Sequence, residues 1–352
     1  MSLKALLKTR IAQQGPLTVA EYMAECLLHP TYGYYATANP FGQQGDFVTA
    51  PEISQMFGEL LGLCLAQSWL DRGRPAPFTL AELGPGRGTM MRDILRATQG
   101  VPGFLDSAEI WLVEASDKLR AVQRETLARY SVRHVSDVYS LPPQPLFFVA
   151  NEFFDALPVR QFVRGEHFWR ERQVGLVDDS LGFGLGPETP QPSLAGRLSD
   201  TDPGDLIEYA PAAAPIMHAL GRLVADQGGA GLVIDYGDWR SLGDTLQAVK
   251  AHQKTNPLIS PGKADLTAHV DFEALAAACP CPVSRLCPQG VFLERLGITA
   301  RAEALAKSLE KDTLKSHIAA HRRLTHPDEM GNLFKVLGVF ADNARPLPGL
   351  DV

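Results

Sequence analysis

A glycine-rich segment is the part of this sequence best suited to hold a small ligand. Residues 78–83 (FTLAEL) form a short, mostly apolar stretch that predicts a β-strand, and residues 84–88 (GPGRG) follow it directly. Apolar residues then recur at helical spacing over residues 89–95. A helix that begins there would direct its unpaired N–H groups towards whatever the turn holds. This arrangement predicts a site for a nucleotide-type cofactor.

The spacing of the glycines distinguishes between two cofactors. The dinucleotide pattern G-x-G-x-x-G would need a glycine where Thr89 stands, whereas Gly84, Gly86 and Gly88 form G-x-G-x-G. This spacing favours S-adenosylmethionine, because its carboxylate and ribose must approach the backbone closely and its sulfonium would attract a carboxylate such as Glu82. A nicotinamide dehydrogenase is disfavoured, and a simple loop is the other interpretation.

Two acidic residues follow the next predicted strands. Glu114 comes directly after residues 108–113 (AEIWLV), at the place where a nucleoside-binding sheet carries an acid for the ribose hydroxyls. Asp137 follows residues 131–135, where a carboxylate could accept the adenine amino group. Each acid could instead be a solvated loop charge. We predict that both belong to the cofactor site.

The fourth predicted strand leads into a cluster of polar residues that predicts the catalytic edge of the sheet. Residues 146–150 (LFFVA) are apolar, as a central parallel strand should be, and Asn151, Glu152 and Asp155 follow. Methyltransferases that act on adenine or glutamine typically have [DN]-P-P-[YF] here. A carboxylate at Glu152 suits a cationic acceptor instead, because it can bind a guanidinium through two parallel hydrogen bonds. The structural alternative is that Asn151 and Asp155 cap the next turn.

Further acids complete the predicted catalytic set. We expect Glu152 and Asp155 to act with Asp235, while Glu208 is an alternative to Asp235 for holding a guanidinium. The segment 265–271 also contains His269 and Asp271, for which a helix cap, a weak metal site and a proton acceptor all remain open. No metal centre is predicted, since the cysteines at 279, 281 and 287 lack paired C-x2-C spacing and are interrupted by prolines.

Strand and helix patterns alternate along most of the chain, which predicts an α/β fold with a mainly parallel sheet. Seven strands are expected, at residues 78–83, 108–113, 131–135, 146–150, 231–234, 283–286 and 333–340. The predicted organisation is an N-terminal helical region, 1–75, with an aromatic lid loop at 29–52, and a second domain over 76–352. That domain carries a β-rich insertion at about 160–227 and a charged helical insertion at about 297–328.

Composition narrows the function classes. The chain of 352 residues has a net charge of -7 and 45% hydrophobic residues, so it can bury a large core and has no general basic surface for bulk nucleic acid. No apolar run approaches the ~18 residues of a membrane span, and the first residues lack a signal peptide pattern. We therefore expect a cytoplasmic protein that is not integral to a membrane, with five reduced cysteines.

Several longer segments resemble the MidA-like family of S-adenosylmethionine-dependent methyltransferases. They are GDFVTAPEISQMFGELLG (45–62), ELGPGRGTMMRDILR (82–96), NEFFDALPVRQF (151–162), GLVIDYGD (231–238), ADLTAHVDF (264–272) and MGNLFKVL (330–337). The resemblance runs nearly end to end. It implies a Rossmann-like class I methyltransferase core with S-adenosylmethionine as cofactor. It also implies methylation of an arginine in a protein, with a complex I subunit as the target of the mitochondrial member.

The resemblance also implies roles for individual positions. It places cofactor contacts at Gly84, Gly86 and Glu114, a lid at Thr49, Pro51 and Glu52, and Glu152 towards the acceptor. One departure is Asp238, where the family pattern leads us to expect histidine. Two rival functions stay open, a small-molecule methyltransferase and an assembly factor that binds the cofactor without turnover. A homodimer is a further expectation.

Overall fold

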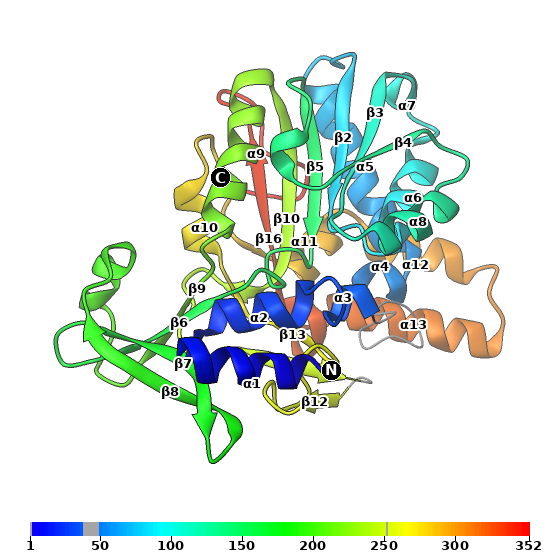
Figure 1. Ribbon diagram of the computed structural model, residues 1–352. Helices are drawn as coiled ribbons and strands as arrows, with labels where there is room; N and C mark the ends of the chain where they lie inside the picture. The colour runs from blue at the N-terminus through cyan, green and yellow to red at the C-terminus, as the bar shows by residue number, and fades with distance from the viewer. Residues whose placement is uncertain (1, 38–48, 251–252) are drawn as a thin grey trace. The chain divides into compact units, whose positions relative to one another are not determined.

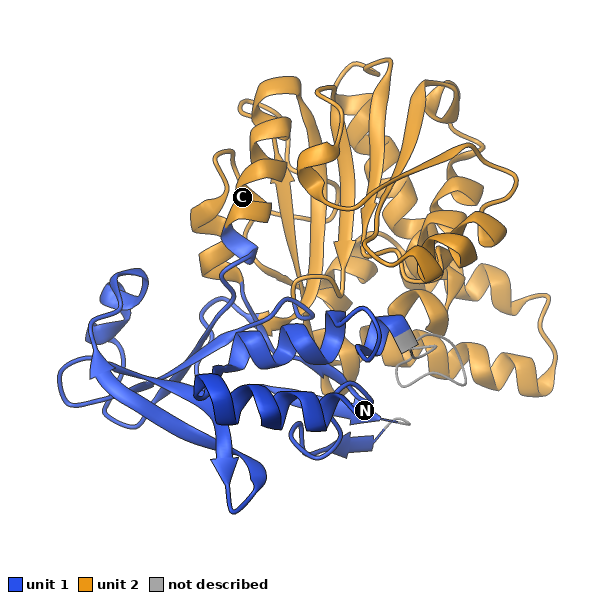
Figure 2. Cartoon of the chain, in the orientation of Figure 1, with its two compact units in different colours: residues 1–47, 155–214, 238–271 blue, residues 48–154, 215–237, 272–352 orange. Residues whose placement is uncertain are grey.

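A mixed sheet forms the centre of one of the two units of the chain in this computed structural model, which describes residues 2–37, 49–250 and 253–352. Figure 2 colours the units separately; unit 1 comprises residues 1–47, 155–214 and 238–271, and unit 2 comprises residues 48–154, 215–237 and 272–352. Each unit therefore combines segments that lie far apart in the sequence.

The sheet of unit 2 has the strand order β15-β16-β10-β5-β2-β3-β4. Its strands are β2 (Phe78–Leu83), β3 (Ala108–Val113), β4 (Val132–Val135), β5 (Leu146–Asn151), β10 (Gly229–Asp238), β15 (Cys287–Pro288) and β16 (Phe334–Phe340). The five strands from β10 to β4 run parallel, whereas β16 is antiparallel to both β10 and β15. The strands β2 and β5 are buried along their whole length, as apolar runs in a parallel sheet require.

Helices make up much of the rest of unit 2, as Figure 1 shows. They are α4 (Ala50–Ile53), α5 (Gln55–Asp71), α6 (Thr89–Thr98), α7 (Phe104–Ser107), α8 (Asp117–Thr126), α9 (Ala213–Gln227), α10 (Phe272–Ala278), α11 (Gln289–Arg295), α12 (Ile298–Ala306) and α13 (Lys311–Thr325), with shorter turns η1 (Val138–Ser140) and η3 (Pro327–Gly331). Helix α5 begins at Gln55, because Ser54 is extended and its side chain caps the Met56 N–H at 3.2 Å.

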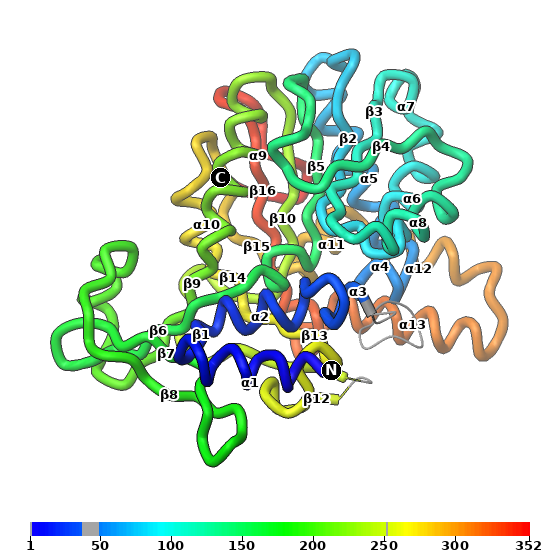
Figure 3. Tube along the Cα trace, in the orientation of Figure 1, coloured from blue at the N-terminus to red at the C-terminus, as the bar shows by residue number. Residues whose placement is uncertain are grey.

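Unit 1 is built from antiparallel strands and short helices. It contains α1 (Leu3–Gln14), β1 (Leu17–Thr18), α2 (Val19–Leu28), α3 (Tyr34–Thr37), β6 (Arg160–Arg164), β7 (Trp169–Val177), β8 (Ser180–Thr189), η2 (Pro192–Ser199), β9 (Leu206–Tyr209), β11 (Gln247–Lys250), β12 (Gln253–Thr255), β13 (Asp265–Thr267) and β14 (Val270–Asp271). The antiparallel strands expected after residue 160 are present. The N-terminal strand β1 joins them by pairing with β7, beside which it runs in Figure 3.

The prediction of an α/β fold is confirmed, with a sheet that mixes parallel and antiparallel strands. One predicted strand is misplaced. Residues 283–286 form no named strand, although Val283 makes an isolated bridge to Val339, and the short strand β15 lies at Cys287–Pro288. The prolines at 280, 282 and 288 explain this, because proline cannot donate to a strand ladder and limits pairing to short stretches.

Candidate active site

The glycine turn, Glu114 and Glu152 lie at the carboxyl edge of the parallel strands in unit 2. Backbone hydrogen bonds join the residues that leave these strands, since the Gly84 N–H donates to Val113 O at 3.0 Å and the Glu152 N–H donates to Ile234 O at 2.9 Å. Glu114 follows Val113 directly. In open α/β sheets, ligands bind outside this edge. The glycine turn and the two acids therefore belong to one region of the sheet.

The glycine turn between β2 and α6 adopts a backbone that requires glycine. The φ angles are 63° at Gly84, 53° at Gly86 and 79° at Gly88, all in the left-handed region. A Cβ atom at Gly84 would also lie 3.1 Å from Cδ2 of Phe153. Gly88 is the N-cap of α6, and its N–H donates to Pro85 O at 2.7 Å. This turn presents bare backbone at the start of a helix, as close binding of a nucleoside-type ligand requires.

Glu114 is held in place by a buried glutamine. Gln123 of α8 donates from Nε2 to Gly86 O at 2.8 Å and to Glu114 Oε2 at 3.2 Å, while its Oε1 lies 3.0 Å from His134 Nε2. Glu114 Oε1 accepts from the Ser116 N–H at 2.8 Å. Burial raises the pKa of Glu114, and these hydrogen bonds oppose that rise. Gln123 links the turn to the acid, yet its place in a polar helix gave no sign of this role.

Two buried acceptor atoms at this edge have no hydrogen-bond partner among the described residues: Oε2 of Glu82 and Oδ1 of Asn151. Burial raises the pKa of Glu82 well above its ordinary value, the negative charges of Asp93 and Glu114 raise it further, and a bond from the Met91 N–H lowers it. Buried acceptors normally have donors. The ammonium and hydroxyl groups of S-adenosylmethionine would supply them, so these residues fit that cofactor.

Replacing Glu82 with Gln should stabilise the unliganded protein increasingly as pH rises. The folded state holds the Glu82 proton more tightly than the unfolded state does, so ionisation at higher pH opposes folding and the unfolding free energy falls between the two pKa values. Gln carries no charge and escapes this loss. Denaturant unfolding at pH 5 and pH 8 should show a larger stability advantage of the variant over the native chain at pH 8 than at pH 5. An equal difference at both pH values would contradict this.

Glu152 lies directly after the last residue of β5, and its backbone has a conformation that residues other than glycine rarely adopt. Its φ angle is 50°, and its Oε1 accepts hydrogen bonds from the Ala50 N–H at 3.3 Å and from Asn151 Nδ2 at 3.1 Å. In the same region, Glu52 of α4 accepts from the Thr89 hydroxyl at 2.6 Å. Such backbone strain persists where the surroundings enforce it, and it clusters at functional sites.

Asp235 is fully buried in β10, and both of its carboxylate oxygens accept backbone hydrogen bonds. Oδ2 accepts from the Phe154 N–H at 3.0 Å, and Oδ1 accepts from the Tyr236 N–H at 3.0 Å. The carboxylate therefore holds the segment that follows Glu152. This geometry gives Asp235 a positioning role beside Glu152.

The other predicted acids, Asp137, Asp155 and Glu208, differ from Glu152 in their hydrogen bonds, and two of them belong to unit 1. Asp137 caps η1, because its Oδ1 accepts from the Ser140 N–H at 3.1 Å. Asp155 belongs to unit 1, where its backbone oxygen accepts from the Ala268 N–H at 3.0 Å. Glu208 also belongs to unit 1, and its carboxylate is bound by Gln161 Nε2 at 2.7 Å and by residues 245–246. The predicted cofactor role of Asp137 and the alternative acceptor role of Glu208 stay predictions.

The predicted lid loop at 29–52 is only partly described, because residues 38–48 lie outside the described residues. Thr49 is the N-cap residue of α4, its side chain makes no capping bond within the described residues, and Pro51 lies in the first turn of that helix. Both residues belong to unit 2, as do the glycine turn and Glu152.

The segment 265–271 forms the short strands β13 and β14, and Asp271 directly precedes the first residue of α10. The His269 N–H donates to the Thr245 hydroxyl at 2.8 Å, and Asp271 Oδ2 accepts from the Ser241 N–H at 3.2 Å. Over residues 2–37, 49–250 and 253–352, no three His, Cys, Asp or Glu side chains are grouped in a way that could hold a metal ion.

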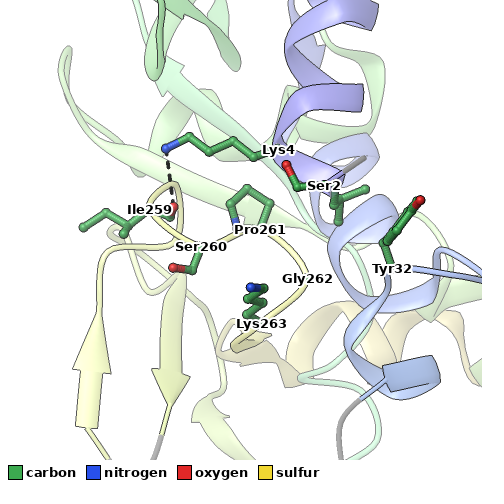
Figure 4. A pocket seen from close by; sticks show the side chains of 9 residues that line it. Ser2, Lys4, Tyr32, Ile259, Ser260, Pro261, Gly262 and Lys263 are labelled. Carbon is green, nitrogen blue, oxygen red and sulfur yellow. Dashed lines mark hydrogen bonds between the residues drawn. The ribbon is translucent and has the colours of Figure 1, made fainter.

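A cavity of about 440 Å³ lies within unit 1, at the start of α1 and the loop 259–263. Figure 4 shows its lining, which includes Lys4, Tyr32 and Lys263, with Lys4 Nζ bonded to Ile259 O at 3.4 Å. The residues that line it include none of the predicted site residues. We therefore place the candidate active site at the sheet edge of unit 2.

Comparison with known proteins decides which family has this site. The family model described as "Putative S-adenosyl-L-methionine-dependent methyltransferase" matches residues 60–283, which include the glycine turn, Glu114 and Glu152. The chain belongs to this methyltransferase family. A structure from Burkholderia thailandensis, solved with S-adenosyl-homocysteine bound, is 30% identical with a TM-score of 0.84, covering 99% of this chain and 94% of that one. S-adenosylmethionine is accordingly the cofactor.

Relatives from animals cover most of this methyltransferase as well. Protein arginine methyltransferase NDUFAF7, mitochondrial, of Xenopus laevis is 37% identical over 94% of this chain and 82% of its own length. The human protein of the same name is 37% identical over 92% of this chain and 80% of its own length. The predicted family resemblance is confirmed.

The expected cytoplasmic location is wrong by this comparison, because these relatives are named as mitochondrial proteins. That expectation came from composition and from the first residues, which are poor guides to a cellular address. Among the helices of the described residues, none has the length and apolar character needed to cross a bilayer.

Proposed function

We propose that this methyltransferase transfers a methyl group to an arginine side chain of a protein. The relatives named above as protein arginine methyltransferases support this, because their sequence alignments with this protein cover nearly the whole chain. The observation that carries the proposal is Glu152, an acid held at the end of β5 by the Ala50 N–H and by Asn151. A carboxylate at that place suits a cationic guanidinium better than a neutral amide.

The proposed cofactor site is the sheet edge of unit 2, in what we propose to be a class I methyltransferase arrangement of seven mostly parallel strands. The proposed contacts are Thr49, Pro51, Glu82, Gly84, Gly86, Gly88, Glu114, Asp137 and Asn151. Bound there, S-adenosylmethionine supplies an electrophilic methyl group on its sulfonium. The left-handed glycines support this placement, as do the oxygens of Glu82 and Asn151 that lack a partner within the described part of the chain.

The proposed acceptor site centres on Glu152. Its carboxylate would bind two nitrogens of the guanidinium and so orient the third nitrogen, which reacts, towards the methyl group. Alignment of the reacting atoms and exclusion of water then lower the barrier, because the enzyme supplies positioning more than chemistry. We propose that Asp235 keeps the segment after Glu152 in place through the Phe154 N–H. Asp155, which follows Phe154 in the chain, is the third proposed catalytic residue beside Glu152 and Asp235.

The proposed partner is a protein that presents an exposed arginine. The family resemblance of the sequence segments implies a subunit of respiratory complex I as that protein. The acidic balance of the chain, with a net charge of -7, is compatible with a basic, arginine-containing segment.

Transfer of labelled methyl groups into a cell lysate tests this function. The purified chain, incubated with methyl-labelled S-adenosylmethionine and lysate, should label a protein band whose hydrolysate contains methylarginine. Label confined to the low-molecular-weight fraction would instead show a small-molecule methyltransferase. Cofactor binding in a calorimeter without label in any fraction would show an assembly protein without turnover. Either of these results would overturn the arginine assignment.

A further inference from the structure

Two cysteines outside the proposed site have their sulfur atoms in contact. Cys279 follows α10, Cys281 comes two residues later, and their Sγ atoms lie 3.5 Å apart. Pro280 separates them and is exposed. The methyl-transfer chemistry proposed above uses neither thiol.

The backbone around the pair holds both cysteines firmly. The Cys279 N–H donates to Leu275 O at 3.1 Å, and the Phe340 N–H donates to Pro282 O at 3.1 Å, so the chain is anchored before and after the pair. Gly221 of α9 packs against this turn, since a Cβ atom there would lie 2.8 Å from the Cys279 Sγ. The two thiols are therefore kept adjacent by their surroundings, which gives each a high effective concentration towards the other.

The two thiols differ in exposure and in acidity. Cys279 is partly exposed, whereas Cys281 is 7% exposed. The hydrogen bond between the two sulfur atoms lowers the pKa of Cys279, and the same bond together with burial raises the pKa of Cys281. The thiolate is the reactive form of cysteine. Cys279 is thus the accessible nucleophile, and Cys281 lies behind it as a second thiol within reach.

The other cysteines provide internal controls, because all three are buried. Burial raises the pKa of Cys26 to about 11 and that of Cys64 to about 12. Burial also raises the pKa of Cys287. These thiols should react slowly.

We propose that Cys279 and Cys281 form a reactive dithiol that exchanges with low-molecular-weight disulfides. The Cys279 thiolate attacks one sulfur of the disulfide, so that a mixed disulfide forms and one thiolate leaves. Cys281 then loses its proton to solvent and attacks the Cys279 sulfur, which forms the Cys279–Cys281 disulfide and releases the second thiolate. The incoming disulfide is reduced by two electrons, and the protein is oxidised by two. A ring closed by C-x-C spacing is small and strained, so the bond should be easily reduced.

Oxidised glutathione is the probe that tests this proposal. After brief exposure and acid quenching, intact mass analysis of the native chain should show loss of two hydrogens without a retained glutathione. The Cys281→Ser variant should accumulate one glutathione, located on Cys279 by peptide mapping. The Cys279→Ser variant should react at least about tenfold more slowly than the native chain. A stable glutathione adduct on native Cys279, or equal reaction rates at Cys287 and Cys279, would overturn the proposal.

A second measurement keeps the test valid if a variant folds poorly. Phenylarsine oxide binds two neighbouring thiols at once and needs no substitution. Pretreatment of the native chain with one equivalent should block loss of the two hydrogens and leave Cys26 and Cys64 free for labelling after unfolding. Exchange that continues at an undiminished rate after this treatment would also refute the assignment.

Discussion

The Glu152→Gln variant should lose methyl transfer while it keeps cofactor binding. Gln retains an oxygen to accept from the Ala50 N–H, so the local backbone should survive, but it removes the negative charge that holds a guanidinium. We expect kcat to fall at least ~100-fold, because aligned charge at the reacting centre is worth that much in other enzymes. The dissociation constant for S-adenosylmethionine should change by no more than about twofold. Labelled-methyl transfer and calorimetry measure the two effects.

The matched control is Glu109→Gln, which neutralises an acid of β3 that is paired with Arg133 at 2.8 Å. This ion pair is partly exposed and contributes little, so activity should stay near the native value. Unchanged methyl transfer in Glu152→Gln would remove the acceptor assignment. A parallel loss of cofactor binding in that variant would instead place Glu152 in the cofactor site.

The Glu114→Ala variant should bind S-adenosylmethionine far more weakly. If Glu114 accepts both ribose hydroxyls, its removal costs two hydrogen bonds to a charged group, each worth about 1.5–3 kcal/mol. The dissociation constant should therefore rise at least ~100-fold in calorimetric titration. At saturating cofactor, kcat should change much less, because the acid is not expected to contact the acceptor.

The control for this variant is Glu125→Ala, an exposed acid in the last turn of α8. It should leave the dissociation constant unchanged. An equal, native-like affinity in Glu114→Ala would show that the ribose lies elsewhere.

Gln123→Leu separates positioning from direct contact. The substitution keeps a buried side chain of similar size but removes the bonds to Gly86 O and Glu114. We expect affinity for the cofactor to fall about tenfold, with kcat at saturation maintained. Gln99→Leu, at an exposed glutamine of comparable length, is the control and should retain native affinity. Loss of kcat without loss of affinity would contradict a positioning role for Gln123.

Local patterns predicted the parts of the fold whose causes are local. The helix α2 has local causes at both ends, because Thr18 and Glu21 form a capping box at its start and His29-Pro30 follows its last residue. The strand β2 was predicted equally well, since an apolar run before glycines has few other interpretations. The strand at 283–286 was misplaced, because the pairing there depends on prolines and on a partner, β16, some fifty residues away.

By itself, the sequence determined the glycine turn, the order of strands and helices, and the acids that follow strands. Local backbone preference and hydrophobic periodicity decide those features. Only the tertiary structure decided which polar side chains already have hydrogen-bond partners within the protein. Asp235 accepts from the Phe154 N–H, Gln123 bridges Gly86 and Glu114, and one oxygen of Glu82 has no partner among the described residues. These contacts join residues from different strands and helices, so no sequence spacing encodes them.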